Sequence, residues 1–254
     1  MDDPGRQIVA WLRTRVAAAG AHGLVVGLSG GLDSSVVARL CQIALPAQVL
    51  GAILPCHSDP QDDADAAYLA EHFGIRTVRI DLQPVFDILV EHLRNGLARV
   101  PNESAEEDDA GENRARLSLS NLKPRLRMTT LYNIAETLNY LVAGTTNRSA
   151  LAVGQFTKHG DGAADILPLG TILKSDVRQL ATALGVPRRI AEKPAGAGLW
   201  VGQNDEDEMG FSYDDLEHYL VQGPEGVAPA LALRLERTIR RNEHKRQTGA
   251  MPEP

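Results

Sequence analysis

Residues 24–35 read Leu24-Val25-Val26-Gly27-Leu28-Ser29-Gly30-Gly31-Leu32-Asp33-Ser34-Ser35. An apolar run leads through a Ser-Gly-Gly turn into a segment with helical periodicity, which predicts a buried strand that turns directly into a helix. Gly30 and Gly31 allow positive φ angles, so consecutive backbone N–H groups can point at one place, where the helix dipole adds partial positive charge. The segment therefore predicts a site for an anion such as phosphate.

Three side chains in this turn extend the prediction. Ser29 and Ser34 can donate hydroxyl hydrogen bonds to phosphate oxygens. Asp33 would be repelled by a polyphosphate unless a divalent cation lay between them, so it suggests Mg²⁺. No Lys follows Gly31, so the pattern is not the Walker A motif, and its glycine spacing is not that of the dinucleotide G-x-G-x-x-G motif either. The alternative is a plain turn in which Asp33 is only an acid at the start of a helix.

The segments around this turn predict the fold class. Apolar runs rich in Val and Ile recur at 24–28, 48–54, 76–80 and 140–143, and helical periodicity occurs at about 34–45, 62–73, 84–97, 174–184, 213–220 and 228–243. Strands that alternate with helices imply an α/β fold, an open, mainly parallel sheet with helices on both faces, Rossmann-like, in which ligands bind beyond the carboxyl ends of the strands. We expect a single domain over residues 1–254.

Two polar segments interrupt this alternation. The acidic segment at about 100–118 has little to bury and predicts a mobile loop. A helix is predicted to follow at about 120–139, and Pro124 fits it only within the first turn, which places the helix start near Ser120. The segment at about 193–210 is too long for a simple connection and is a candidate lid over a site.

Composition narrows the class of protein further. The 254 residues contain 26 Lys and Arg against 33 Asp and Glu, a formal charge of −7, which argues against nucleic acid as an obligatory partner. The sequence has neither a long apolar run nor the pattern of a signal peptide, so we expect a cytoplasmic protein without a membrane partner. Cys41 and Cys56 lack the spacing of metal ligands and are expected to be buried, reduced thiols.

Further polar segments form a second set of candidate site residues. They are Asn121–Met128, Gly144–Asn147, Phe156–Asp165, Lys174, Gly202–Gly210 and His244–Arg246. Lys123 and Arg127 are four residues apart on one face of the predicted helix, a pattern that suits an anionic ligand or a solvated basic stripe. Asp161 and Asp165 lie among glycines and can equally be ligands or turn formers.

The phosphate loop and this second set together resemble the ammonia-dependent NAD synthetase family, in order and spacing from about Leu24 to Arg246. The loop alone resembles the S-G-G-x-D-S signature of the wider ATP pyrophosphatase superfamily. The resemblance implies a fold of the adenine nucleotide alpha hydrolase type and a homodimer. It also implies a reaction in which ATP and Mg²⁺ convert nicotinic acid adenine dinucleotide (deamido-NAD) into an adenylate, which ammonia attacks to give NAD, AMP and pyrophosphate.

The resemblance assigns roles to residues at matching positions. The implied ATP contacts are Ser29, Gly30, Gly31, Asp33, Ser34, Thr145 and Lys174, with Asp33 also on a Mg²⁺ ligand. The implied dinucleotide contacts are Arg127, Lys158, Asp165, His244 and Lys245. The implied catalytic residues are Asp33, Asp161 near the reacting carboxylate, and Lys174, which can neutralise charge on the departing pyrophosphate.

Two positions depart from the family pattern. Ala150 stands where the family usually has a Glu that supplies a second magnesium carboxylate, so the site would use water, ATP oxygens or another acid such as Asp161. Gly196 stands where the family typically presents Ser or Thr to the ATP phosphates. These departures leave two alternatives open: a related amide ligase acting on another carboxylate, or a nucleotide-binding paralogue with impaired catalysis.

Overall fold

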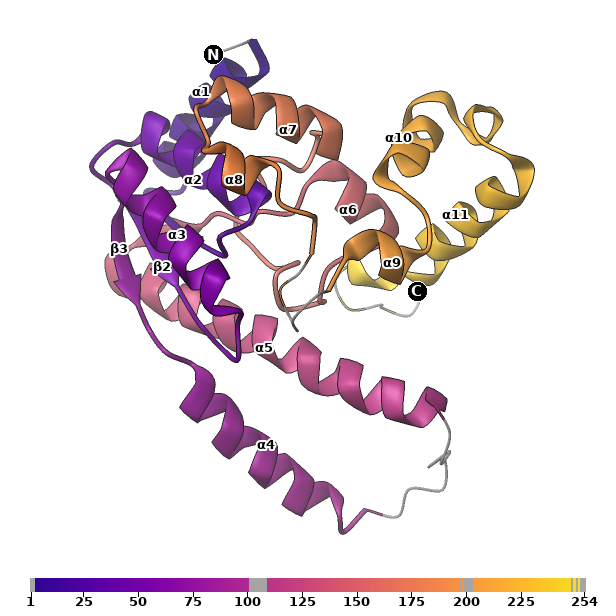
Figure 1. Ribbon diagram of the computed structural model, residues 1–254. Helices are drawn as coiled ribbons and strands as arrows, with labels where there is room; N and C mark the ends of the chain where they lie inside the picture. Colours follow the sequence, from indigo (N-terminus) through magenta and orange to yellow (C-terminus); the bar gives the residue numbers. More distant parts are fainter. Residues whose placement is uncertain are drawn as a thin grey trace.

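Four parallel strands form a sheet at the centre of the molecule (Figure 1). In the computed structural model, which describes residues 3–100, 109–196, 198, 203–247, 249 and 251, the strands are β1 (Gly23–Gly27), β2 (Val49–Ile53), β3 (Arg76–Arg79) and β4 (Tyr140–Val142). Their order is β3-β2-β1-β4, and Leu24 of β1 is in register with Val49 of β2 and Leu141 of β4. Each strand falls on a predicted apolar run, so these predictions are confirmed.

Helices cover both faces of the sheet, as predicted. Leu24 and Val26 belong to one apolar core, and Val25 between them belongs to another, because alternate residues of a strand point to opposite faces. The first core is shared with α1 (Asp3–Ala18), α2 (Leu32–Ala44), α3 (Pro60–Phe73), α7 (Lys174–Ala183) and α8 (Arg188–Ala191). The second is shared with α4 (Gln83–Leu97) and α5 (Asp109–Leu138). Cys41 and Cys56 are free and buried, one in each core.

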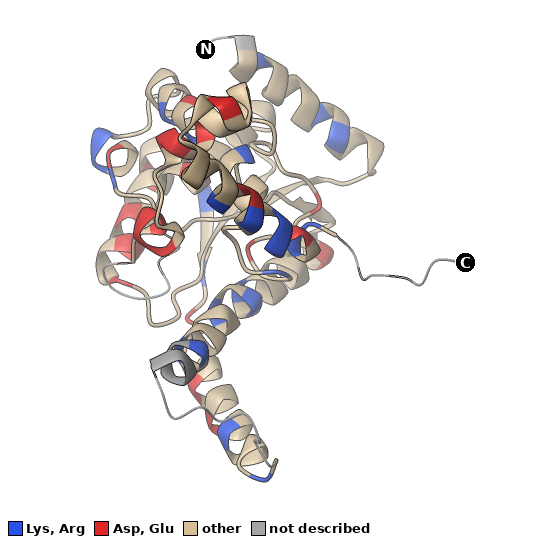
Figure 2. Cartoon of the chain, turned by 90° about the vertical axis from the view of Figure 1, so that its right-hand side faces the viewer, with Lys and Arg blue, Asp and Glu red and all other residues tan. Residues whose placement is uncertain are grey.

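Helix α5 is longer than predicted. It begins at Asp109, so residues 109–118 are helical and the predicted start near Ser120 is wrong. Residues 114–119 contain good helix formers, and Leu119 packs against the second core. Both views show α4 and the first half of α5 extending together away from the sheet (Figures 1 and 2). The rest of the predicted acidic loop, residues 101–108, lies outside the described residues.

The predicted position of Pro124, in the first turn of the helix, is wrong for the same reason. Pro124 lies inside α5 and not in its first turn. A proline there has no N–H for the carbonyl of residue 120, so the helix lacks one of its hydrogen bonds at that point. Pro124 is buried and lines the pocket described below.

Helix α6 and the last part of the chain form a helical layer with its own apolar core. This layer contains α6 (Arg148–Val153), α9 (Asp205–Met209), α10 (Tyr213–Gln222), α11 (Pro229–Arg241) and the short helices η1 (Pro224–Gly226) and η2 (Glu243–Lys245). Val153, Leu216 and Leu235 are buried in this third core. The predicted lid therefore includes helix α9, while residues 197 and 199–202 of that segment lie outside the described residues. Among the helices that the structure describes, none is both long and apolar enough to span a membrane.

Candidate active site

A pocket lies at the carboxyl ends of β1, β2 and β4, where the strand order changes direction across the sheet. Parallel α/β sheets bind ligands at such a switch point. Of the predicted site residues, the pocket is lined by Ser29, Gly31, Asp33, Ser34, Arg127, Thr145, Asp161 and Lys174, together with Ala150 and Gly196. Four predicted dinucleotide contacts are not part of its lining: Lys158, Asp165, His244 and Lys245.

The turn between β1 and α2 has the backbone of an anion site. Gly30 has φ +72°, and a Cβ there would lie 2.3 Å from the carbonyl oxygen of Asp62, so glycine is required twice over. Gly31 has φ −98°, so the predicted positive φ is wrong for this second glycine. Gly31 is the N-cap of α2 and makes no side-chain cap hydrogen bond, which leaves the N–H groups of the first turn facing the pocket region without an intrahelical partner.

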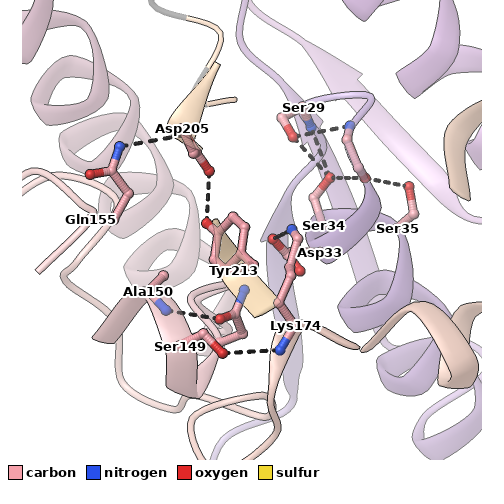
Figure 3. A network of polar contacts seen from close by, with 12 residues as sticks. Ser29, Asp33, Ser34, Ser35, Ser149, Ala150, Gln155, Lys174, Asp205 and Tyr213 are labelled. Carbon is pink, nitrogen blue, oxygen red and sulfur yellow. Dashed lines mark hydrogen bonds and ion pairs between the residues drawn. The ribbon is translucent and has the colours of Figure 1, made fainter. Parts of the chain in front are cut away.

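The serine hydroxyls of this turn are bonded to one another and to the backbone. Ser29 Oγ and Ser34 Oγ are 3.0 Å apart, and Ser34 Oγ donates to the carbonyl of Gly31 at 3.0 Å. Gly31 N donates in turn to Ser29 Oγ at 3.3 Å. These contacts hold the turn in the shape that presents its amides (Figure 3), and both serines are among the residues that line the pocket.

Lys174 and Asp33 form an ion pair inside the pocket. Lys174 Nζ lies 2.6 Å from Asp33 Oδ2, although the two residues are 141 positions apart in the chain. Asp33 Oδ1 is buried and has no hydrogen-bond partner among the described residues. Lys174 is the first residue of α7, and its backbone N donates to Ser149 Oγ at 3.1 Å, which fixes where the side chain enters the pocket.

Tyr213 and Asp205 buttress this ion pair from the side of the predicted lid (Figure 3). Lys174 Nζ lies 5.7 Å from the centre of the Tyr213 ring, within the range of a cation–π contact. The Tyr213 hydroxyl donates to Asp205 Oδ2 at 2.8 Å, and Gln155 Nε2 donates to Asp205 Oδ1 at 3.5 Å. Burial raises the pKa of Asp205, and burial followed by the nearby Asp205 charge raises the pKa of Tyr213.

Sequence reasoning assigned no role to Tyr213, and it quoted Asp205 only as part of a polar segment. The only sequence signal for Asp205 was the acidic stretch that follows Gly202. It also missed Asp62 and Asp63 of α3, which line the pocket beside the phosphate loop. Lys193 bridges Asp62 and Asp65 by ion pairs, and these contacts anchor the start of the predicted lid to α3.

Arg127 and Lys123 share a face of α5 but are not a solvated basic stripe. Arg127 Nε donates to the carbonyl of Leu54 and Arg127 Nη2 to Ser58 Oγ, both at 3.1 Å. Lys123 is buried, and its Nζ donates to the carbonyl of His57 at 3.4 Å. Burial lowers the pKa of both cations. Of the two, only Arg127 lines the pocket, where it can meet an anionic ligand.

The two predicted aspartates of the glycine-rich segment lie in different places. Asp161 lines the pocket, and its Oδ1 accepts a hydrogen bond from Thr157 N at 2.9 Å. Burial raises the pKa of Asp161, while the Thr157 N–H and Arg127 oppose that shift. Asp165 instead accepts from the backbone N of Val142 at 2.7 Å, at the end of β4. Its carboxylate therefore holds the chain against the sheet.

Ala150 and Gly196, the two departures from the family pattern, lie in different structural surroundings. Ala150 is buried in the pocket wall, and its N donates to the Asn147 side chain, the N-cap of α6, at 3.0 Å. At Gly196 a Cβ would lie 2.5 Å from the carbonyl oxygen of Gln203. A Ser or Thr does not fit this backbone, so Gly196 meets a steric requirement of the segment that packs over the pocket.

Comparison with known proteins gives one consistent family. A family model described as NAD synthase matches residues 5–249. The chain is 44% identical, over 99% of its length and 97% of the relative, to an NH3-dependent NAD+ synthetase of Carboxydothermus hydrogenoformans.

Solved structures agree with this match. An NMN synthetase from Francisella tularensis has a TM-score of 0.87 and 34% identity, with 99% of each chain covered. An NH3-dependent NAD synthetase from Campylobacter jejuni has a TM-score of 0.77 and 26% identity, with 100% of each chain covered. This chain belongs to the NAD synthase family.

Proposed function

We propose that this chain is a ligase that uses ATP and ammonia to amidate deamido-NAD, with NAD, AMP and pyrophosphate as products. The observation that carries the proposal is the meeting of three features in one pocket: the open amides at the start of α2, the partly free carboxylate of Asp33, and the ammonium of Lys174. These groups suit a polyphosphate whose charge changes during the reaction. The 44% identical ammonia-dependent relative supports the same activity.

The first step in this proposal is the transfer of AMP to the substrate. An oxygen of the substrate carboxylate attacks the α-phosphorus of ATP, the bond from that phosphorus to the bridging oxygen breaks, and pyrophosphate leaves with the electron pair. The amides of the β1–α2 turn hold the phosphates, and Lys174 moves little because Asp33 and Tyr213 already fix its ammonium.

The second step forms the amide. Ammonia attacks the carbonyl carbon of the adenylate, the bond to the AMP oxygen breaks, and one proton leaves the nitrogen. We assign the acceptance of that proton to Asp161, because it lines the pocket and burial raises its pKa toward the range of a general base. No covalent bond to the protein is required in either step.

The residues present fit a magnesium ion at Asp33. Its buried Oδ1 has no partner among the described residues, and a carboxylate oxygen of this kind is a suitable ligand for a hard cation. Within the part of the chain that the structure describes, no group of three His, Cys, Asp or Glu side chains can hold a metal. Asp33 would hold Mg²⁺ at this oxygen, and the bound ion would neutralise charge on the phosphates.

A second candidate substrate is the acid mononucleotide, nicotinic acid mononucleotide. Two observations favour it: the structural similarity to the Francisella tularensis NMN synthetase, and the absence of Lys158, Asp165 and Lys245 from the pocket lining. The polar atoms of these three side chains are bonded within the protein. The chemistry at the carboxylate would be the same, and only the length of the substrate would differ.

The test is a comparison of kcat/KM for the two acids, with saturating ATP, Mg²⁺ and ammonium. We expect deamido-NAD to be preferred by about tenfold or more, which corresponds to about 1.4 kcal/mol of transition-state binding. A preference for the mononucleotide would transfer the proposal to the second candidate. Folded protein that makes neither NAD nor NMN would contradict both.

We also propose a homodimer that works in the cytoplasm, on the basis of the family resemblance. The two free, buried cysteines are consistent with a reducing compartment. Sedimentation equilibrium of the purified chain tests the assembly, and a mass of one chain at micromolar concentration would contradict the dimer.

A further inference from the structure

Helix α7, which begins with Lys174, is capped by side chains from two other helices. Its N-cap residue, Leu173, makes no side-chain cap hydrogen bond. The backbone N of Lys174 instead donates to Ser149 Oγ of α6 at 3.1 Å (Figure 3). The backbone N of Ser175 donates to both carboxylate oxygens of Glu217 in α10, at 3.2 and 3.3 Å. The first N–H groups of a helix have no intrahelical partner, so these contacts supply what the side chain of Leu173 cannot.

The two capping side chains are bonded to each other. Ser149 Oγ donates to Glu217 Oε1 at 2.7 Å, so this hydroxyl accepts from α7 and donates to α10. Ser149 is fully buried, and Glu217 is only 7% exposed. A buried carboxylate is costly unless hydrogen bonds or opposite charge compensate it. The Ser149 hydroxyl, the Ser175 N–H and the positive end of α7 provide that compensation, so three helices meet at one buried charge.

Helix α10 reaches both ends of Lys174. Tyr213 and Glu217 are four residues apart in α10, a spacing that places them on the same face of the helix. The Tyr213 ring centre lies 5.7 Å from Lys174 Nζ, whereas Glu217 binds the first turn of α7, where the lysine side chain begins. One helix therefore holds both the base and the tip of the side chain that pairs with Asp33.

We propose that Glu217 is a positioning residue: with Ser149 it fixes the start of α7, and it thereby directs the Lys174 ammonium to Asp33 and to the phosphates of ATP. The lysine side chain is a flexible four-carbon stem, so a small rotation at its base displaces the ammonium by more. A misplacement of about 1 Å in an active site can cost about a hundredfold in rate. The kinetic part of this proposal rests on the proposed function, whereas the structural part does not.

The first measurement uses the full-length protein without any nucleotide. Glu217→Gln keeps the size and removes the charge, and Ser149→Ala removes the bridging hydroxyl. Both are expected to speed hydrogen exchange of the amides of Lys174 and Ser175 by about tenfold. Asp214→Asn, on an exposed acid of α10, is the control and should leave exchange unchanged.

Thermal unfolding shows whether each variant is folded, and Ser149→Ala carries the test if Glu217→Gln does not fold. Unchanged exchange in a folded variant would overturn the capping role.

The second measurement asks whether Glu217 acts through Lys174. Glu217→Gln should lower kcat by about tenfold while KM for the dinucleotide stays within about threefold, because Lys174 is assigned to charge that builds up on the departing pyrophosphate. In the Lys174→Met background the same substitution should change kcat by no more than about twofold, since residues that act as a unit are not additive. Equal losses in both backgrounds, or faster exchange with unchanged kcat, would overturn the positioning role.

Binding of pyrophosphate distinguishes a failure of this proposal from a failure of the proposed function. Calorimetry with Mg²⁺ and inorganic pyrophosphate needs no turnover and uses the same variants. Glu217→Gln should weaken binding by about tenfold in the wild-type background and by no more than about twofold in the Lys174→Met background. If the wild-type protein made no NAD, this difference would still support the proposal, and equal weakening in the two backgrounds would overturn it.

Discussion

Lys174 Nζ lies 2.6 Å from Asp33 Oδ2, and the other carboxylate oxygen of Asp33 is buried without a partner among the described residues. One oxygen thus holds the ammonium, and the other is left for a ligand in the pocket. This division ties Asp33 to both the cation and the phosphates in the proposed reaction, because a carboxylate can accept at both oxygens.

Asp33→Asn is expected to lower kcat by about 10²–10³-fold, the usual effect of removing one electrostatic group from an active site. The amide keeps the shape but loses the charge that pairs with Lys174. Turnover is measured by pyrophosphate release, and thermal unfolding checks the fold. Asp176→Asn, on an exposed acid of the same helix as Lys174, is the matched control. Wild-type turnover in Asp33→Asn would show that this carboxylate is not used.

Ala150→Glu should restore a second carboxylate to the pocket wall and lower the Mg²⁺ concentration needed for half-maximal activity, by severalfold. Ala150 lines the same pocket as Asp33, so an acid there is near any cation that Asp33 holds. Ala150→Gln has the same size without the charge and should not lower that concentration. Equal magnesium requirements for the two variants would argue against a cation at this place.

Gly196→Ser is expected to slow the enzyme, although the family resemblance implies Ser or Thr at this position. Its Cβ would lie 2.5 Å from the Gln203 carbonyl, so the backbone over the pocket must move. Gly196→Ala should lower kcat/KM for ATP to a similar extent, since the clash comes from Cβ. A serine variant faster than the wild type would instead show that a phosphate ligand is missing here.

Tyr213→Phe should destabilise the protein in a pH-dependent way. Burial raises the folded-state pKa of Asp205 above its ordinary value of 3.8, so the unfolded chain releases this proton first and stability falls as pH rises through the interval between the two values. Loss of the phenol donor raises that pKa further and widens the interval. Urea unfolding should show a loss of about 1–3 kcal/mol at neutral pH that shrinks toward about pH 4.

The double variant Tyr213→Phe/Asp205→Asn provides the control for this prediction. It carries no titrating group at position 205, so its stability should not show the fall with rising pH that is expected for Tyr213→Phe. If both variants have the same pH dependence, Asp205 is not the group responsible.

The sheet and the phosphate loop could be predicted because their signals are local. The apolar runs of β1 to β4 and the Ser-Gly-Gly turn each lie within a dozen residues. The start of α5 could not be predicted. The acidic residues before it are typical of a loop, and the packing of Leu119 against helix α4 is not visible in the sequence. The prediction gave the acidic composition more weight than the helix propensity of residues 114–119.

Some residues of the site could be predicted from the sequence, but the contacts between them could not. Asp33 and Lys174 were both proposed, but their pairing across 141 positions is visible only in the fold. Tyr213 and Asp205 carry no motif, since a buried hydrogen bond between two side chains has no sequence spacing to mark it. Lys245 was assigned to substrate by resemblance, and its hydrogen bonds to two backbone carbonyls could not have been inferred from a basic tail.

The identity of the nucleotide products tests the central claim most directly. Purified protein with ATP, Mg²⁺, ammonium and deamido-NAD should form NAD, AMP and pyrophosphate in equal amounts, and none of the three should appear without the acid. Formation of ADP and inorganic phosphate would contradict the account, because it would place bond cleavage between the β- and γ-phosphates and not at the α-phosphorus.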